Sequence, residues 1–197
     1  VAKSLHLFKH TAMTPEQILA QLKLPVFVKP NNGGSSLGMS KVSEAGKLQE
    51  ALDKAFREDE QVLVEEAIVG REFTIGVFRT KGQVITLPIT EIITKNEFFD
   101  FEAKYQGASE EVTPAVLDEA IADKIRAEAK KAYAVFNCRG VVRMDFIFEA
   151  EQQKPFLLEI NTVPGQSEAS IVPQQVKAMG WTLKDFYTAL VEECFKD

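Results

Sequence analysis

A strand–turn–strand pattern in the second half of the chain constrains the fold more than any other feature. Polar and apolar residues alternate from Val141 to Phe148, and a second apolar run extends from Phe156 to Ile160. The polar segment 149–154 separates the two runs. A period of two residues predicts a half-buried strand, and a short polar segment between two such strands predicts a tight reversal. The pattern therefore predicts a β-hairpin.

One face of this hairpin carries an unusual set of polar residues. Because residues two apart in a strand share a face, Arg143 and Asp145 point the same way, as do Glu159 and Asn161 on the partner strand. The opposite face is expected to be apolar, with Val142, Met144, Phe146, Leu158 and Ile160. Two carboxylates and an amide oxygen suit a hard cation such as Mg²⁺, and Arg143 can hold a developing anion beside them. The alternative is a solvated face with a weak Arg–Asp pair.

The rest of the chain alternates irregularly between helical and extended patterns. A first helix is predicted after the N-cap and capping box Thr14-Pro15-Glu16-Gln17, with Ile18, Leu19 and Leu22 buried, and a second after Ser43. A third is predicted along the apolar stripe Leu117, Ile121, Ile125, Ala129, Ala132 and Phe136. A fourth begins at Thr182-Leu183-Lys184-Asp185 and is expected to bury Leu183, Phe186, Leu190 and Val191. Strands are predicted over 25–28, 61–66, 71–78 and 84–93, the last two joined by a turn at Lys81-Gly82. The expected fold class is α+β, with helices packed on antiparallel sheets in two lobes.

Composition narrows the class of protein. The 197 residues are 45% hydrophobic and 26% charged, and no apolar run approaches the roughly 18–20 residues that span a bilayer. A net charge of −6 argues against a nucleic-acid or anionic-membrane partner. Two cysteines are too few for a disulfide framework, and Cys138 is expected to be a buried free thiol. The cytoplasm is the consistent compartment. The chain lacks an initiating Met, so we expect it to begin inside a longer product.

A glycine- and serine-rich segment follows the first predicted strand. It begins at Lys29 and includes Gly33, Gly34, Ser35 and Ser36. Glycines let backbone N–H groups approach phosphate oxygens, hydroxyl groups add donors, and the lysine adds a positive charge. The segment matches neither the Walker loop nor the Gly-x-Gly-x-x-Gly fingerprint. Phosphate binding is therefore one hypothesis, and a simple turn is the other.

Two further segments carry candidate binding residues. Acidic residues lie where the strand 61–66 gives way to the strand beginning at Arg71, a place where a nucleotide base can meet backbone groups and a carboxylate can meet the ribose. The aperiodic segment 98–109 contains Lys104 and Tyr105, a cation and a phenol that suit a lid over phosphates. Charged strand ends and an ordinary surface loop are the respective alternatives.

Taken in order, these motifs resemble the ATP-grasp superfamily and in particular the D-alanine–D-alanine ligases. The resemblance is carried by Val28-Lys29-Pro30 with Gly34-Ser35-Ser36-Leu37-Gly38-Met39, Glu72-Phe73-Thr74, Glu102-Ala103-Lys104-Tyr105, Arg143-Met144-Asp145, and Leu158-Glu159-Ile160-Asn161-Thr162 with Pro164-Gly165. It extends from Leu24 to the C-terminus. It implies an ATP-grasp fold with the nucleotide held between a small lobe, residues 1–68, and a large lobe, residues 69–197.

The resemblance also implies a role for each matching residue. Lys29 and Lys104 would contact ATP phosphates, and Ser35 and Ser36 would belong to the loop over the reaction centre. Glu65, Glu66, Ala67 and Ile68 would bind the adenine, and Glu72 the ribose. Asp145, Glu159 and Asn161 would hold two Mg²⁺ or Mn²⁺ ions. Arg143 and Gly165 would stabilise the tetrahedral intermediate, Ser170 would bind the second D-alanine's carboxylate, and Tyr105 would orient the loop.

The activity implied is the ATP-dependent joining of two D-alanine molecules through a D-alanyl phosphate, for peptidoglycan precursor synthesis, in a homodimer. Tyr105 resembles the dipeptide-forming members rather than those that make a D-alanine–D-lactate ester. The family's N-terminal domain has no counterpart here, and the segment 8–25 is shorter than the family's, so the isolated chain is expected to ligate poorly. The alternatives are another ATP-grasp carboxylate–amine ligase and a nucleotide-binding module that has lost catalysis.

Overall fold

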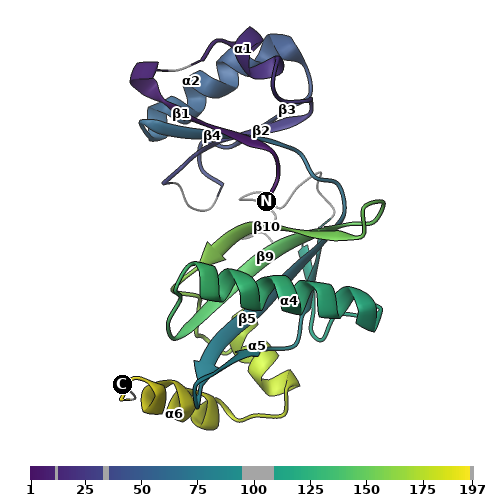
Figure 1. Cartoon of the computed structure of the whole chain (residues 1–197), viewed down its shortest axis with the longest axis vertical. Coiled ribbons are helices and arrows are strands. Elements are labelled where there is room, and N and C mark those ends of the chain that lie inside the picture. The colour runs from purple at the N-terminus through teal and green to yellow at the C-terminus, as the bar shows by residue number, and fades with distance from the viewer. Residues whose placement is uncertain (12, 33–35, 95–108, 196–197) are drawn as a thin grey trace. The chain divides into compact units, whose positions relative to one another are not determined.

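The computed structural model describes residues 1–11, 13–32, 36–94 and 109–195 (Figure 1). The chain forms two compact units, one containing Val1–Ile68 and the other containing Val69–Ile93 and Glu110–Asp197. Each unit is an antiparallel sheet covered by helices, so the predicted α+β class is confirmed. Within the described residues, no helix is both long and apolar enough to cross a membrane.

The first unit is a four-stranded sheet with two helices on one face. In spatial order its strands are β1 (Ser4–Phe8), β4 (Gln61–Glu66), β2 (Val26–Pro30) and β3 (Ser40–Val42), and its helices are α1 (Pro15–Leu19) and α2 (Leu48–Glu58). Helix α1 begins with the predicted capping box, in which Thr14 and Gln17 exchange side-chain-to-backbone hydrogen bonds. The sheet contributes alternate residues to the core, because every second side chain of a strand points toward the helices.

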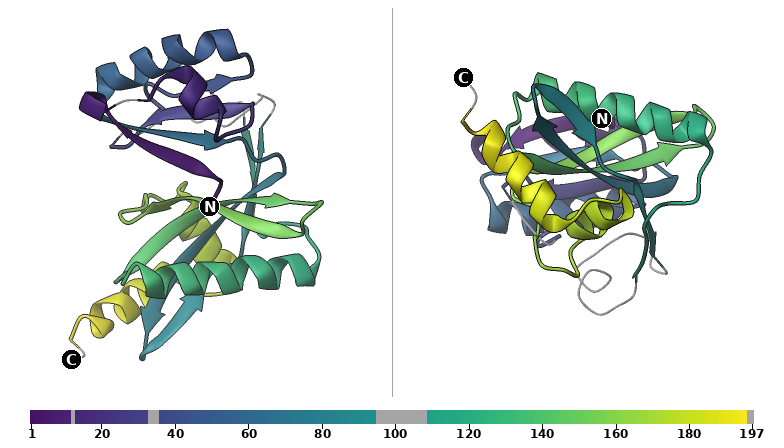
Figure 2. Two further views of the ribbon diagram at one scale, coloured as in Figure 1. Left: turned by 45° about the horizontal axis from the view of Figure 1, so that its top comes forward. Right: turned by 90° about the horizontal axis from the view of Figure 1, so that it is seen from below.

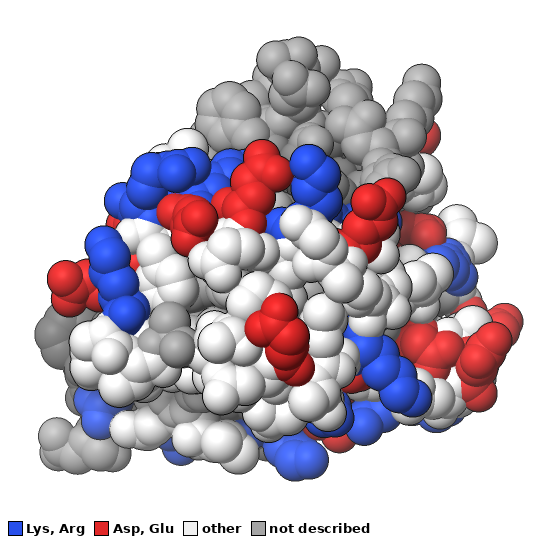
Figure 3. All heavy atoms as spheres, turned by 90° about the horizontal axis from the view of Figure 1, so that it is seen from above, with Lys and Arg blue, Asp and Glu red and all other residues white. Residues whose placement is uncertain are grey.

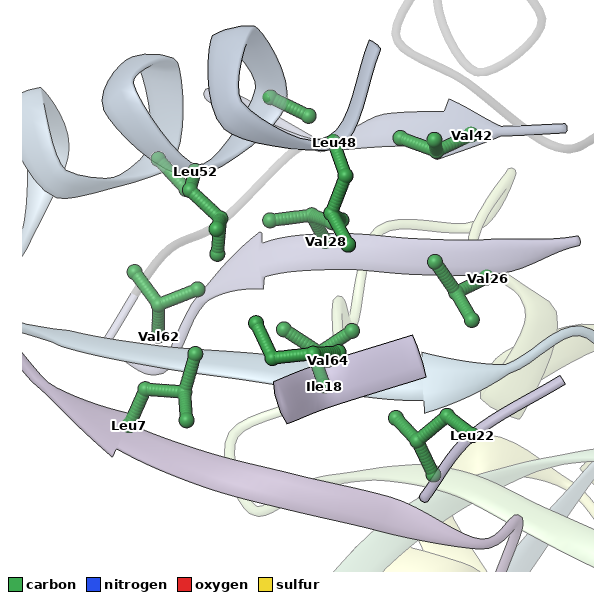
Figure 4. Close-up of a cluster of buried hydrophobic side chains, with 12 residues drawn as sticks. Leu7, Ile18, Leu22, Val26, Val28, Val42, Leu48, Leu52, Val62 and Val64 are labelled. Carbon is green, nitrogen blue, oxygen red and sulfur yellow. The ribbon is translucent and has the colours of Figure 1, made fainter. Parts of the chain in front are cut away.

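The core of the first unit lies between α1, α2 and the sheet. Aliphatic side chains from six elements meet there, as Figure 4 shows: Leu7, Ile18, Leu22, Val26, Val28, Val42, Leu48, Leu52, Val62 and Val64. All are at most 3% exposed, so each full side chain contributes about 1.5–3 kcal/mol of burial free energy.

On the face shown in Figure 3, the described Lys and Arg side chains are interspersed with Asp and Glu.

The second unit is a six-stranded sheet with helices on both faces. Its strands follow the order β10 (Lys154–Asn161), β9 (Val141–Glu149), β5 (Arg71–Thr80), β7 (Thr90–Thr94) and β8 (Ser109–Val112), and β6 (Gln83–Thr86) also pairs with β5. Its helices are α4 (Glu119–Val135), α5 (Ile171–Ala178) and α6 (Leu183–Glu193). The predicted hairpin is β9–β10, and the predicted turn at Lys81-Gly82, with φ values of 50° and 75°, joins β5 to β6.

The two faces of this sheet are used differently. Helix α4 packs on Phe73, Ile75 and Val77 of β5 and on the alternate apolar residues of β9. Helices α5 and α6 pack on the opposite face, against Phe78 and Leu87. Figure 2 shows α4 in green on one side of the strands and α5 and α6 in yellow on the other. Because residues alternate along a strand, Glu72 and Thr74 lie on the α5 side of β5.

The predicted single strand over 84–93 is wrong. The segment forms two strands, β6 and β7, which pair with different parts of β5. Pro88 lies between them and has no N–H group to donate to a ladder, so the pairing stops there. Strands β1, β3 and β8 and helix α5 were not predicted.

Three predicted core positions are also wrong. Phe136 is 63% exposed because α4 ends at Val135, and the chain turns away through Asn137, whose φ is +48°. Val191 is 56% exposed, since five residues after the buried Phe186 correspond to a rotation of about 140° around an α-helix. Leu158 does not join the core that Leu157 and Ile160 contact, because β10 contains a bulge between Leu157 and Glu159.

Candidate functional site

Arg143 and Asp145 form an ion pair on the face of the sheet opposite α4. The Arg143 Nε donates to Asp145 Oδ1 at 2.9 Å and its Nη2 to Asp145 Oδ2 at 2.8 Å, the parallel geometry that makes such pairs strong. Nη2 also lies 3.6 Å from Glu159 Oε1. The side chains of Arg143 and Asp145 are 21% and 16% exposed, so the pair is shielded from solvent, whereas Glu159 is 57% exposed.

The β10 bulge sets the position of the hairpin's polar residues. After the bulge, Glu159 lies opposite Asp145 and Asn161 lies opposite Arg143 in the antiparallel register. The extra residue, Leu158, shifts the alternation by one, and this shift puts Glu159 and Asn161 on the same face as the ion pair. The prediction that these four residues share a face is therefore confirmed, although the apolar residue behind them is Leu157.

A third strand supports Asp145 from the other side. Thr74 of β5 lies opposite Asp145 of β9, and its Oγ1 donates to Asp145 Oδ1 at 2.5 Å. Thr74 is 2% exposed, so this hydrogen bond to a carboxylate is protected from water. Burial lowers the pKa of Arg143, but hydrogen bonds and charge from Asp145, with the charges of Glu159 and Glu111, outweigh it and raise that pKa above its usual value.

The oxygen-bearing side chains here fit a hard divalent cation by their chemistry. Asp145, Glu159 and Asn161 supply two carboxylates and an amide oxygen on one face, and Mg²⁺ needs only one or two carboxylates when phosphates supply the rest. The Asn161 Oδ1 accepts a hydrogen bond from the Val163 backbone at 3.1 Å, which orients that oxygen. Among the described residues, no group of three or more His, Cys, Asp and Glu side chains gathers as a metal site by itself.

The loop after β10 brings two hydroxyl groups together at the start of α5. Ser170 is the N-cap of α5, and its Oγ lies 2.8 Å from the Oγ of Ser167, whose backbone oxygen accepts from the Ser170 N–H at 2.8 Å. A Cβ placed on Gly165 would lie 2.7 Å from Ser170 Oγ, so only glycine fits there without a shift. Hydroxyl groups beside the N-terminus of a helix suit a carboxylate.

In the first unit, the predicted phosphate lysine is paired with a predicted nucleotide-binding acid. Lys29 Nζ lies 2.6 Å from Glu65 Oε1 on the adjacent strand, on the face of the sheet that α1 and α2 leave open. Glu66 instead accepts from the Lys23 backbone at 2.8 Å, and the Ala67 N–H donates to Pro25 at 2.9 Å. These bonds fix the end of β4 to the segment before β2.

The described ends of the predicted phosphate loop are also fixed. The Asn32 N–H donates to Asp59 Oδ2 at 2.7 Å, and this hydrogen bond is the main cause that lowers the pKa of Asp59. Ser36 has a φ of +59° and accepts a hydrogen bond from the Met39 N–H. Ser35, Lys104 and Tyr105 lie outside the described residues.

Three residues of this site were not predicted from the sequence. Thr74 donates a hydrogen bond to Asp145, and the hydroxyl of Ser167 pairs with that of Ser170. The charge of Glu111 of β8 helps to raise the pKa of Arg143, and its carboxylate accepts from Gln174 of α5 at 3.4 Å. Glu72 lies on the same face of β5 as Thr74. A threonine two residues from Glu72, followed by the apolar segment 75–78, is a signal that the sequence contained. Nothing in the sequence marks Ser167 or Glu111.

Comparison with known proteins identifies relatives along nearly the whole chain. A family model described as the C-terminus of D-Ala D-Ala ligase matches residues 3–192. A D-alanine–D-alanine ligase from Parabacteroides distasonis is 43% identical over 100% of this chain and 59% of the relative. One from Bacteroides fragilis is 40% identical over 99% of this chain and 60% of the relative. The chain thus spans about three-fifths of the curated relatives that it matches.

Solved structures agree with the sequence relatives. The VanG D-Ala:D-Ser ligase from Enterococcus faecalis aligns with a TM-score of 0.85 at 30% identity, over 98% of this chain and 56% of that one. A D-alanine–D-alanine ligase from Bacillus anthracis, complexed with ATP, aligns with a TM-score of 0.80 at 26% identity, over 98% and 59%. The predicted ATP-grasp fold is confirmed by these similarities. The chain belongs to the D-alanine–D-alanine ligase family.

Proposed function

We propose that the full-length protein containing this chain joins two D-alanine molecules to D-alanyl-D-alanine with ATP, for peptidoglycan precursors. The observation that carries the proposal is the shielded Arg143–Asp145 pair with Glu159 and Asn161 on one sheet face, in a chain of this family. A solvated surface face does not need a parallel two-bond ion pair that a buried threonine supports from a third strand. These residues are the kind that a reaction on an anionic substrate requires: a cation to hold the anion, and oxygen ligands for a metal ion.

The proposed reaction has two steps that use different residues. A carboxylate oxygen of the first D-alanine takes the terminal phosphoryl group of ATP, which releases ADP and forms an acyl phosphate. The amine of the second D-alanine then attacks the carbonyl carbon, loses a proton, and displaces phosphate. Arg143 has the charge to hold the negative oxygen that develops, and Gly165 is proposed to assist it. Gly165 lies against Ser170, whose Oγ would be 2.7 Å from a Cβ at this position. Ser170, with Ser167, holds the carboxylate of the second D-alanine.

Asp145, Glu159 and Asn161 are the residues proposed to hold Mg²⁺ or Mn²⁺, two ions in all. When bound, the ions neutralise the phosphate charge of the nucleotide. The Arg143 guanidinium contacts Asp145 and lies near Glu159. Arg143, which pairs with Asp145 in this structure, is the group proposed to hold the reacting anion.

The nucleotide is proposed to lie between a small lobe, residues 1–68, and a large lobe, residues 69–197. Lys29, with Lys104, contacts the phosphates, and Ser35, Ser36 and Tyr105 belong to segments over the reaction centre. The adenine is bound by Glu65, Glu66, Ala67 and Ile68, and the ribose by Glu72. The Lys29–Glu65 pair supports this assignment in part, because Lys29 needs a counter-charge until phosphates replace it.

The experiment that tests the proposal measures ADP release by the full-length protein with Mg·ATP. D-Alanine is added alone, with D-serine, or with D-lactate. The D-serine arm is included because a D-Ala:D-Ser ligase is among the similar structures. Strong stimulation by D-alanine alone, with D-alanyl-D-alanine as the product, supports the dipeptide ligase. If the protein binds ATP but none of these compounds stimulates ADP release, the proposal is rejected in favour of a ligase that joins another carboxylate and amine.

A further inference from the structure

Three buried polar side chains among the described residues, Thr74, Thr90 and Gln175, belong to one hydrogen-bond network. They are 2%, 0% and 0% exposed. The Gln175 Nε2 donates to the Thr74 backbone oxygen and to Thr90 Oγ1, both at 3.0 Å. Its Oε1 accepts from the Gly76 N–H at 2.9 Å. The amide of Gln175 therefore uses both of its N–H groups and its oxygen.

Gln175 fills the break between β6 and β7. Strand β7 pairs with β5 as far as Thr74, and β6 pairs with β5 from Val77 onward. On this edge Ile75 and Gly76 of β5 are therefore paired with neither strand, although β9 pairs with them on the other edge. The Gln175 amide accepts from the N–H of Gly76 and donates to the carbonyl of Thr74, as a peptide group of a neighbouring strand would do. A Cβ on Gly76 would lie 2.6 Å from Leu87 Cδ1 and 2.9 Å from Gln175 Oε1, so the absence of a side chain there admits both the leucine and the amide.

The network connects the two halves of the candidate site. At one end, Thr74 donates its hydroxyl to Asp145, the partner of Arg143. At the other end, Gln175 lies in the second turn of α5, five residues after the N-cap Ser170. An apolar side chain would fill the volume of Gln175 without fixing the helix in rotation or along its axis, because apolar contacts are not directional. Three hydrogen bonds to β5 and β7 do fix both.

We propose that Gln175 is a positioning residue, which sets Ser170 in register with the Asp145–Arg143 pair so that the second amino acid is held beside the reacting carbon. This inference rests on the proposed function. Ser170 touches the substrate and Gln175 acts through it. Gln175 therefore controls binding of the attacking amino acid rather than of ATP.

The test uses the full-length protein, and wild-type ADP release with D-alanine is measured first. Gln175→Met keeps the length of the side chain and removes its hydrogen bonds. We expect the KM for D-alanine to rise roughly tenfold or more, since small displacements of positioning groups have effects of this size, while the KM for ATP changes by less than about twofold. Gly76→Ala places a Cβ 2.9 Å from Gln175 Oε1 and 2.6 Å from Leu87 Cδ1, so it presses on the same amide as well as on Leu87, and it is expected to raise the KM for D-alanine in the same way.

The matched control is Val176→Ala, which removes fully buried methyl groups from the same helix and leaves the network in place. It should lower the unfolding temperature without changing either KM. The inference is overturned if Gly76→Ala leaves the KM for D-alanine unchanged, or if Val176→Ala raises it as much as Gln175→Met does. If Gln175→Met does not fold, the result for Gly76→Ala decides. Absence of wild-type turnover with D-alanine would instead reject the proposed function, and this inference with it.

Discussion

Thr74→Val is the substitution whose effect the structure defines most narrowly. Valine has nearly the shape of threonine, so the change removes one hydroxyl group and leaves the packing in place. That hydroxyl donates to Asp145 Oδ1 at 2.5 Å from a residue that is 2% exposed. A hydrogen bond to a charged group contributes about 1.5–3 kcal/mol, and the lower part of this range applies because Asp145 keeps its two bonds from Arg143.

We therefore expect Thr74→Val to lower the free energy of unfolding by about 1.5–2 kcal/mol. For a chain of this size, each kcal/mol corresponds to about 2–4 °C, so the unfolding temperature should fall by about 3–8 °C. The single tryptophan, Trp181, packs near Phe78 in the same unit, with ring centroids 6.0 Å apart, and its fluorescence reports unfolding of that unit. Urea and thermal unfolding of the 197-residue chain would be followed by this signal.

Thr86→Val, the same chemical change on β6, is the control and should alter stability by less than about 0.5 kcal/mol. A loss below about 0.5 kcal/mol for Thr74→Val as well would refute the reasoning, because it would mean that the hydroxyl gives Asp145 nothing that water does not. ADP release by the full-length Thr74→Val protein should also fall, since Asp145 loses one of the groups that orient it.

Three further predictions concern other parts of the molecule. The hydrogen bond from Asn32 lowers the pKa of Asp59 in the folded chain, so this bond stabilises the folded chain above the unfolded pKa of about 3.9, and the stabilisation is lost as the pH falls through the folded value. The difference in urea midpoint between the wild type and Asp59→Asn should therefore be larger at pH 6 than at pH 3. Equal differences at the two pH values would contradict this prediction. Gly165→Ala should raise the KM for D-alanine, because the new Cβ would lie 2.7 Å from Ser170 Oγ; an unchanged KM would show that the loop moves freely. Arg143→Lys should lower the rate of ADP release about tenfold or more with the fold intact by circular dichroism, because lysine cannot donate two parallel bonds, and full activity would show that charge alone suffices.

Local signals in the sequence predicted the elements that local chemistry determines. The capping boxes that open α1 and α6 occur as expected, because each is completed by residues three apart in the chain. The turn at Lys81-Gly82 and the alternation along β9 were predicted for the same reason. Pro88 is a local signal that breaks one expected strand, 84–93, into two. The completion of the broken edge could not be predicted in the same way, because it depends on Gln175, which is 99 residues from Gly76 in the chain.

The candidate site shows the same division. Arg143, Asp145, Glu159 and Asn161 were expected on one face because strands alternate, and the structure brings them together. The expected alternation of β10 was nevertheless displaced by its bulge, and a bulge depends on how two strands meet rather than on either sequence. The partners that hold the site, such as Ser167 for Ser170, are contacts of folded loops. No periodic pattern predicts them.

The central strands β5 and β9 have one apolar face, which packs under α4, and one face that carries the Arg143–Asp145 pair. On the α4 side, Phe73, Ile75, Met144 and Phe146 are at most 1% exposed, and truncating such residues costs about 2–5 kcal/mol. On the other side, β9 presents Arg143 and Asp145, which a sheet needing only stability would replace with apolar residues under a helix. The packed face keeps these strands in register, so the polar face can hold charged groups at fixed positions without contributing to the core. Substitutions on the α4 side should therefore reduce the amount of folded protein, whereas those at the ion pair should reduce turnover by protein that still folds.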